Sequence, residues 1–208
     1  MSLGTAAVRK SPLWTPAIML GKYLAASCLG IFLGLVITFI EIEHGKGFTA
    51  IEAGPWTGWP RSEASEIDPY TRAILAYSGK ISLSESEAMS FVAQGSSDGA
   101  AFDPDCDYTI KGEVPPARYW TLSLLSPAGT LIGNMTDRRG FTSSEVLRAS
   151  DGRFEITLSR HARPGNWLPL GSASKFILVL RLYDNELGAT EGTLDAAHMP
   201  AIAKGRCR

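Results

Sequence analysis

The longest apolar stretch of the chain lies near its N-terminus. Between Thr15 and Ile40 the only charged residue is Lys22, and Tyr23 to Ile40 carries no charge at all. A helix of about 20 mostly apolar residues crosses the hydrocarbon core of a bilayer, and a lysine near one end reaches the headgroups. The pattern therefore predicts a single transmembrane helix over residues 15–40.

Flanking charges predict the orientation of this helix. Arg9 and Lys10 precede it, whereas two acidic residues follow within three positions of its end. Because basic residues stay on the cytoplasmic side, residues 1–14 are expected in the cytoplasm and residues 41 onward outside. One alternative is a cleaved signal peptide, although its apolar core would be unusually long. Another is a lipoprotein signal ending at Cys28, although the sequence stays apolar after that cysteine.

Two segments with different patterns follow the predicted transmembrane helix: an irregular one and then a short helix. Residues 41–66 show no sustained period and are expected to form a linker, in which Trp56 and Trp59 rest either at the membrane interface or on the following domain. Asp68 then suits the N-cap of a short helix, and Pro69 suits its first position.

The next segment, residues 84–94, fits two structures. Ser84 and Glu87 satisfy a helix capping box, whereas Met89, Phe91 and Ala93 alternate with polar residues as in a strand. The alternation favours a strand that ends in the turn GSSDG.

From Cys106 onward, short runs rich in β-branched and aromatic residues alternate with turns rich in proline and glycine. The runs are CDYTIKG, RYWTLSLLSP, GTLIGN, GRFEITLS and KFILVLRLYD. Such runs predict strands, and many short strands of this kind predict an antiparallel sandwich. Residues 67–208 are therefore expected to form one mainly β domain with one or two short helices.

The stretch RPGNWLPLG precedes the last long run. Pro164 and Gly165 suit a turn, Trp167 suits a buried position at the end of the sandwich, and Pro169 prevents pairing as a central strand. These features favour a structural corner, and a binding rim is the alternative.

Charge and cysteine content narrow the partners and the compartment. The chain has net charge -1. The part that follows the predicted membrane helix, residues 41–208, is mildly acidic, so no nucleic-acid partner is expected. Cys28 lies in the apolar stretch. Cys106 and Cys207 face an oxidising compartment in the predicted topology, where a disulfide between them would hold the C-terminal segment to the sheet. The alternative is two unpaired thiols.

Catalytic and metal motifs are weak. GSSDG matches the nucleophile pattern around Ser97, but no helix pattern follows it, which favours a simple turn. The histidines are scattered, and Asp103, Asp105 and Asp107 alternate without the glycine and glutamate of a calcium loop. We therefore expect no metal and no cofactor.

Polar and aromatic side chains near strand ends are the candidate ligand-binding residues. Arg118 adjoins two large aromatics, and Arg181 and Tyr183 form the polar end of one strand face. In the alternative, Trp120 fills the core and Arg118 pairs with a carboxylate. The full candidate set is Arg118, Asn134, Asn166, Trp167, Arg181 and Tyr183.

Three segments together resemble a known bacterial family, the domain of unknown function 1214. They are YTIKGEVPPARYWTLSLLSPAGTLI, DGRFEITLS and PGNWLPLGSASKFILVLRLYDNE. The chain resembles the short, membrane-anchored branch of this family. The resemblance implies a jelly-roll-like sandwich outside the inner membrane, and it supports the strand at residues 87–94 and the pairing of Cys106 with Cys207. It implies no catalytic mechanism.

The sequence thus favours a single-pass inner-membrane protein whose periplasmic sandwich binds an envelope protein or a glycan without catalysis. The alternative is an envelope hydrolase or carbohydrate-active enzyme at the same rim, with Glu113, Asp137 and Glu145 as acid–base candidates. A structural role beside a membrane complex is a third possibility. A deep pocket would favour the enzyme, and a flat apolar patch would favour the other two.

Overall fold

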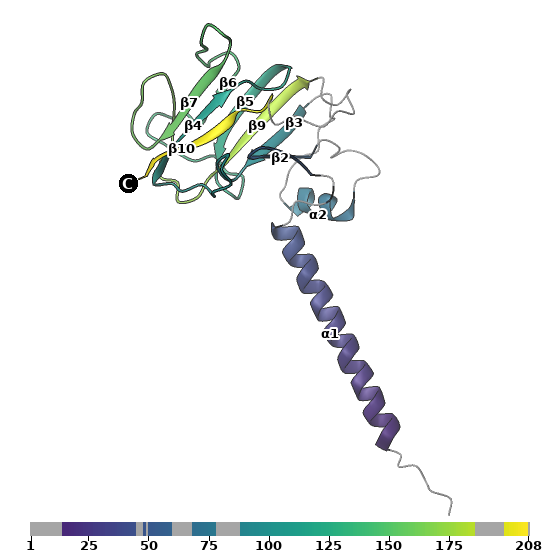
Figure 1. Ribbon diagram of the computed structural model, residues 1–208. Coiled ribbons are helices and arrows are strands. Elements are labelled where there is room, and N and C mark those ends of the chain that lie inside the picture. Colours follow the sequence, from purple (N-terminus) through teal and green to yellow (C-terminus); the bar gives the residue numbers. More distant parts are fainter. Residues whose placement is uncertain are drawn as a thin grey trace, which may run out of the picture.

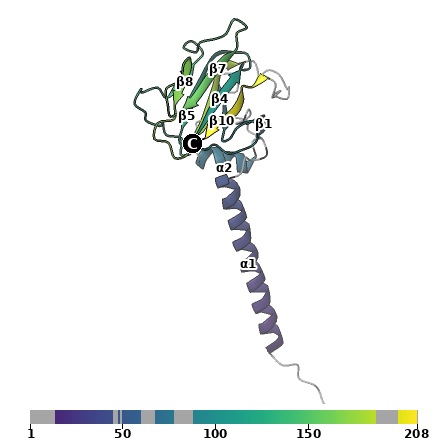
Figure 2. The same cartoon turned by 60° about the vertical axis from the view of Figure 1, so that its left-hand side comes forward.

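A long helix and a β-rich body make up the protein in the computed structural model (Figure 1). The structure describes residues 14–44, 48, 50–59, 68–77, 88–185 and 198–207. The helix α1, Trp14–His44, projects away from the strands in both views (Figures 1 and 2). Residues 18–43 of α1 have a mean hydropathy of 2.3 and pack none of their apolar side chains inside the molecule. This helix is therefore long and apolar enough to span a membrane.

A hairpin forms within the segment that the sequence suggested was an irregular linker. Strands β1, Ile51–Ala53, and β2, Trp56–Gly58, pair antiparallel, and β2 pairs in turn with β3. Gly54 supplies the positive φ of 60° that the tight turn needs. The expectation of an irregular segment is corrected here, because strands of three residues are too short to show a period. Trp56 is fully buried and thus rests on the domain.

Six strands form the larger sheet, in the order β1-β2-β3-β9-β5-β6. Besides the hairpin, its strands are β3 Ala88–Ala93, β5 Ala117–Leu125, β6 Gly140–Thr142 and β9 Ile177–Asn185. All neighbours in this sheet pair antiparallel. The strand expected near residues 87–94 is confirmed as β3, while residues 84–87 with the alternative capping box lie outside the described part of the chain.

Four strands form the smaller sheet, in the order β10-β4-β7-β8. They are β4 Cys106–Gly112, β7 Phe154–Ser159, β8 Asn166–Pro169 and β10 Ala201–Cys207. An antiparallel sandwich was expected. Strand β8, however, pairs parallel to β7, so one pair in the sandwich departs from that expectation. The stretch predicted as a corner is this edge strand. Its position agrees with Pro169, which has no N–H to donate to a further neighbour.

The hydrophobic core lies between the two sheets. Three alternate residues of the central strand β9 are at most 1% exposed: Leu178, Leu180 and Leu182. Their cross-strand partners on β5 and β3 point to the same face of the sheet. The smaller sheet contributes Ile110 and Ile156, both fully buried. This period of two confirms the predicted mainly β sandwich.

Two further expectations concern short elements. Helix α2, Pro69–Tyr77, begins as predicted, because the backbone N–H of Thr71 donates to Asp68 Oδ1 at 2.9 Å. The run GTLIGN, in contrast, is not a strand. It contributes one isolated bridge, between Leu131 and Leu125, because the chain turns back immediately after β5.

The C-terminal strand β10 is fixed to the sheet both by pairing and covalently. It pairs antiparallel with β4, and a disulfide joins Cys106 to Cys207 across 101 positions of sequence. Cys28 is a free and exposed thiol in α1. The turn GSSDG also contacts β10, since the Ile202 N–H donates to Ser97 Oγ at 2.8 Å.

Candidate functional site

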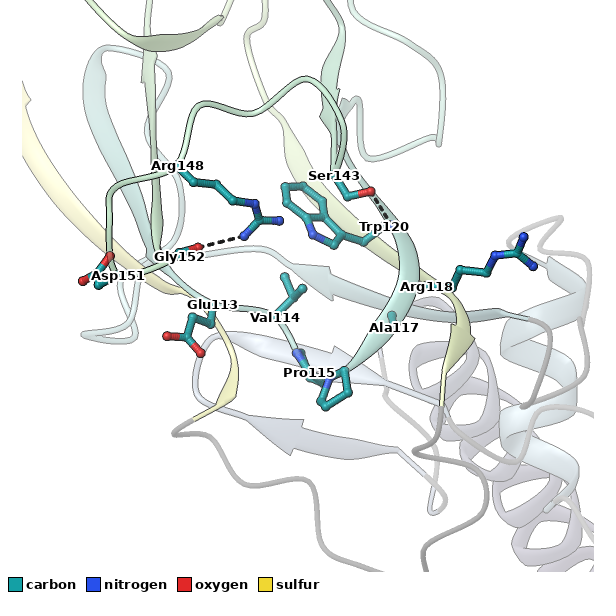
Figure 3. Close-up of a pocket in the computed structure, with 11 residues that line it drawn as sticks. Glu113, Val114, Pro115, Ala117, Arg118, Trp120, Ser143, Arg148, Asp151 and Gly152 are labelled. Atoms are coloured by element: carbon teal, nitrogen blue, oxygen red, sulfur yellow. Dashed lines mark hydrogen bonds between the residues drawn. The ribbon is translucent and has the colours of Figure 1, made fainter.

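A pocket of about 480 Å³ opens at one end of the sandwich (Figure 3). Three segments build it: the β4–β5 connection, the first residues of β5, and the loop that precedes β7. Its lining is Glu113, Val114, Pro115, Pro116, Ala117, Arg118, Trp120, Ser143, Arg148, Asp151 and Gly152. Because the connection joins one sheet to the other, the pocket lies where the two layers meet.

Trp120 on β5 forms the aromatic wall of this pocket. Its side chain is 2% exposed, and its ring packs against Phe154 of the facing sheet with centroids 5.0 Å apart. The loop after β6 is held against it, since the Ser143 N–H donates to the Trp120 carbonyl at 2.9 Å. Within the described residues, the indole Nε1 has no hydrogen-bond partner. In Figure 3 this nitrogen faces the space between Val114 and Arg148.

Arg148 extends over the pocket from the opposite loop. Its guanidinium carbon lies 5.8 Å from the centre of the Trp120 ring and 5.9 Å from that of Phe154. Nη1 donates to the carbonyl of Gly152 at 2.9 Å, which holds the side chain across the loop. The guanidinium therefore combines a cation–π contact with donors that remain directed at the pocket.

A neighbouring arginine offsets part of the negative charge on the acidic side of the pocket. Arg153 Nε lies 3.4 Å from Glu113 Oε1 and 4.0 Å from Asp151 Oδ2. Among the described residues Arg148 forms no ion pair with a carboxylate, so its positive charge is available to the pocket. Two kinds of donor, one cationic and one neutral, thus converge on the same space.

Of the six candidate residues predicted from the sequence, only Arg118 lines the pocket. Its side chain points away from Trp120, as Figure 3 shows, and it pairs with Asp184 at 3.7 Å. Trp120 fills the core and Arg118 meets a carboxylate, which is the alternative that the sequence left open. Arg118 therefore contributes mainly its backbone and stem to the pocket.

Asn166 and Trp167 hold the β8 edge in place. The buried Asn166 accepts from the Leu147 N–H at 2.7 Å and donates to the carbonyls of Leu147 and Glu155 at 2.8 and 2.9 Å. Trp167 Nε1 donates to the Ser159 carbonyl at 3.0 Å. The side-chain amide of Asn166 and the indole N–H of Trp167 therefore bond to backbone groups of the protein.

The other three candidates lie elsewhere. Asn134 closes its own turn, donating to the Arg138 carbonyl at 2.6 Å and accepting from the Thr136 N–H at 3.1 Å. Arg181 and Tyr183 lie on the face of the larger sheet opposite Trp120, where the Tyr183 ring is 6.0 Å from that of Tyr119. The structure brings these two together, but not with the remaining candidates.

Sequence reasoning missed Arg148 and Asp151 as lining residues. They stand in TSSEVLRASDG, a loop whose residues carry no periodic pattern, so nothing local relates them to Trp120. The proline turn before Arg118 was a usable signal, because it marks the connection that forms the pocket floor. The pairing of this loop with Trp120 depends on how the two sheets stack.

The other candidate chemistry is accounted for by structural contacts. Ser97 bonds to the backbone of Ile202 in β10: its N–H donates to the Ile202 carbonyl and its hydroxyl accepts from the Ile202 N–H, both at 2.8 Å. Asp105 and Asp107 lie beside Arg160 and Arg163. Over the described ranges, no three side chains of His, Cys, Asp or Glu are grouped as metal ligands.

Solved structures resemble the fold at low sequence identity. The VPA0106 protein from Vibrio parahaemolyticus matches with a TM-score of 0.59 and 16% identity, over 96% of this chain and 47% of that one. An uncharacterised protein from Burkholderia cenocepacia matches with a TM-score of 0.44 and 16% identity, over 80% of this chain and 39% of that one. The chain thus spans less than half the length of either protein. No protein of curated function matches it.

One family model covers the central strands and both sides of the pocket. Residues 87–186 match the family described as "Protein of unknown function (DUF1214)". The matched segment runs from the start of β3 to the end of β9 and includes Trp120, Arg148 and the β4–β5 connection. This segment of the chain therefore matches the DUF1214 family, in agreement with the resemblance seen in the sequence.

Proposed function

We propose that the protein is a single-pass inner-membrane protein whose periplasmic sandwich binds an envelope component, protein or glycan, at the Trp120–Arg148 pocket without catalysis. In this arrangement residues 1–14 are cytoplasmic, residues 15–40 cross the bilayer, and residues 67–208 form the extracytoplasmic domain. The β1–β2 hairpin, at residues 51–58, joins that domain from within the linker.

The anchor is supported by length, composition and redox chemistry. The 26 residues of the apolar segment span about 39 Å at the usual helical rise, more than the roughly 30 Å of a hydrocarbon core. The basic residues before the helix favour a cytoplasmic N-terminus. The Cys106–Cys207 disulfide supports an oxidising compartment for the domain.

Binding is supported by one observation above all: the buried Nε1 of Trp120 lies without a partner, among the described residues, beside the guanidinium of Arg148. Buried donors are almost always satisfied, so an unsatisfied one at the wall of a pocket suggests that a ligand supplies the acceptor. The pocket, about 480 Å³, is broad and open to solvent, so a ligand bound there would stay exposed on one side.

A hydrolase is the alternative, and a pocket at the rim, rather than a flat apolar patch, is the feature that counts in its favour. Of its three acid–base candidates only Glu113 lines the pocket, whereas Asp137 pairs with Arg139 and Glu145 accepts from the Thr142 hydroxyl. The second carboxylate of the pocket, Asp151, shares Arg153 with Glu113. An enzyme at this site would lose turnover in Glu113→Gln with folding retained, whereas a pure binding site would retain its ligand without converting it.

Cross-linking in intact membranes tests the proposal. Full-length protein at native abundance is cross-linked, purified and analysed by mass spectrometry and glycan analysis. We expect an envelope component that is recovered with the wild type and with Arg138→Ala, and lost with Arg148→Ala. Arg138 is a matched control, because it also lies over an aromatic ring, Phe141 at 4.6 Å, but outside the pocket. Equal recovery with all three proteins would contradict the proposed site.

A further inference from the structure

We infer that the pocket recognises a carboxylate, held between the Arg148 guanidinium and the Trp120 indole N–H, on a small ligand that also carries amine or hydroxyl groups. This inference rests on the proposed function and adds the chemical class of the ligand. Acidic sugars and the C-terminus of a short peptide both offer this chemistry.

The indole sets the first requirement, which is an acceptor. A tryptophan Nε1–H only donates, and burial has removed Trp120 from the water that would otherwise accept. The nitrogen is aimed at the pocket, between Val114 and Arg148 (Figure 3). A ligand oxygen placed there gains a hydrogen bond without breaking one that the described protein already makes.

Arg148 sets the second requirement, which is negative charge on that acceptor. Arg148 is exposed, and among the described residues its guanidinium makes one hydrogen bond, to the carbonyl of Gly152. The nitrogen of Trp120 is itself shielded from solvent. Binding at this nitrogen therefore requires a neighbouring side chain to shift, and we assign this to the exposed Arg148, whose guanidinium carbon lies 5.8 Å from the ring centre. After that shift the guanidinium and the indole hold one carboxylate from two sides.

The acidic rim sets the third requirement, which excludes strongly anionic ligands. Glu113 and Asp151 lie on the same side of the pocket in Figure 3, near Gly152. Arg153 engages Glu113 through Oε1 and offsets part of the charge, yet a doubly charged phosphate would still meet two carboxylates. A ligand with one negative charge avoids this repulsion, and its amine or hydroxyl groups can donate to the same carboxylates.

The remaining wall limits shape. Val114 and Pro115 present an apolar, conformationally restricted surface under the indole, as Figure 3 shows. Proline fixes the backbone of this connection, so the surface is preorganised. A pyranose ring or a dipeptide backbone fits about 480 Å³ and can lie on this surface.

Calorimetric titration of the full-length protein in detergent micelles tests the inference. The probes are glucuronate for acidic sugars and glycylglycine for peptide termini, with glucose and inorganic phosphate as controls. We expect one or both carboxylate probes to bind, glucose and phosphate to bind at least tenfold more weakly, and the stronger carboxylate probe to identify the source.

Three variants locate the binding. Trp120→Phe removes the indole N–H and keeps an aromatic core residue, and it should weaken the carboxylate probe about tenfold, the usual effect of one lost hydrogen bond. Arg148→Lys keeps the charge without the fork of donors and should also weaken it, whereas Arg138→Lys should not. Thermal melts check folding, and Arg148→Lys decides the matter if Trp120→Phe does not fold.

Each other result overturns the inference in a distinguishable way. Equal binding of glucose, tighter binding of phosphate, or unchanged affinity in Arg148→Lys would reject the carboxylate class. Failure of every probe would reject it too. If the membrane cross-link still depends on Arg148 in that case, the proposed binding function survives with a different ligand. If the cross-link is independent of Arg148, both proposals fail.

Discussion

The indole nitrogen of Trp56 donates a buried hydrogen bond of 2.8 Å to the carbonyl oxygen of Pro200, a residue 144 positions later in the sequence. The contact joins the β1–β2 hairpin to the segment that leads into β10. It therefore ties the region next to the apolar helix to the C-terminal strand of the sandwich.

Trp56→Phe is expected to lower the free energy of unfolding by about 1–3 kcal/mol, because the Pro200 carbonyl would lose its donor in a buried place. Thermal unfolding of the full-length protein in detergent, followed by near-ultraviolet circular dichroism, measures this change. Phe48→Leu serves as a control, because Phe48 is 80% exposed. Equal melting temperatures for Trp56→Phe and the wild type would show that the bond contributes nothing.

Asn166→Ala is expected to destabilise the protein by roughly 2–4 kcal/mol, since the change removes one acceptor and two donated hydrogen bonds at a buried position. Denaturant unfolding of the variant and the wild type measures the difference. Asn134→Ala is the matched control. Its bonds are exposed, so its cost should stay near or below about 1 kcal/mol, and a larger effect there than at Asn166 would contradict this explanation.

Cys207→Ser is expected to destabilise the domain by up to about 4.7 kcal/mol in the chain-entropy treatment of a loop of this length, since the disulfide closes 101 positions. Unfolding with and without a reductant measures the effect, and the reductant should act on the wild type but not on the variant. Cys28→Ser should leave stability unchanged, because Cys28 is unpaired in α1. Reductant-insensitive wild-type stability would contradict a structural role for the bridge.

The turn after β3 should add a small pH-dependent component to stability. The Ser96 hydroxyl and then the Ala100 N–H donate to Asp98 and hold the pKa of its carboxyl below the ordinary value. A lowered folded-state pKa stabilises the fold fully above the unfolded value of about 3.9, and this contribution is lost as pH falls through the folded value.

Asp98→Asn removes that titration. Wild type should therefore melt higher than the variant by a constant margin from pH 7 to about pH 5, and the margin should narrow below about pH 4. Melting curves across this range provide the test. A margin that widens on acidification would show that the carboxylate is not favoured in the folded state.

The fold was predictable where burial follows a regular period. The strands β4, β7 and β9 stand almost residue for residue where the alternation of apolar and polar positions put them. The helix cap at Asp68 was equally local, because its carboxylate reaches a backbone N–H three residues later. Features such as strand periodicity and helix capping depend on a few adjacent residues, so the sequence alone predicts them.

Prediction failed where long-range pairing decides the structure. The segments IEA and WTG are too short to show a strand pattern in the sequence. They form strands because WTG pairs with β3 and IEA pairs with WTG. The parallel partner of β7 follows it after six residues, which no turn rule anticipates. The site shows the same limit, since Arg118 was found from its own neighbours whereas Arg148 meets Trp120 only through the stacking of two sheets.

The contacts of residues 200–207 also bear on synthesis. The Pro200 carbonyl accepts from the Trp56 indole, the Ile202 N–H donates to the Ser97 hydroxyl, and Cys207 forms a disulfide with Cys106. Three elements from the first half of the chain therefore make these contacts only after this segment has been synthesised. While the ribosome is still making these residues, one edge of the smaller sheet lacks its partner. The smaller sheet therefore reaches its full width only after every strand of the larger sheet has been made, because β9 precedes β10 in the chain.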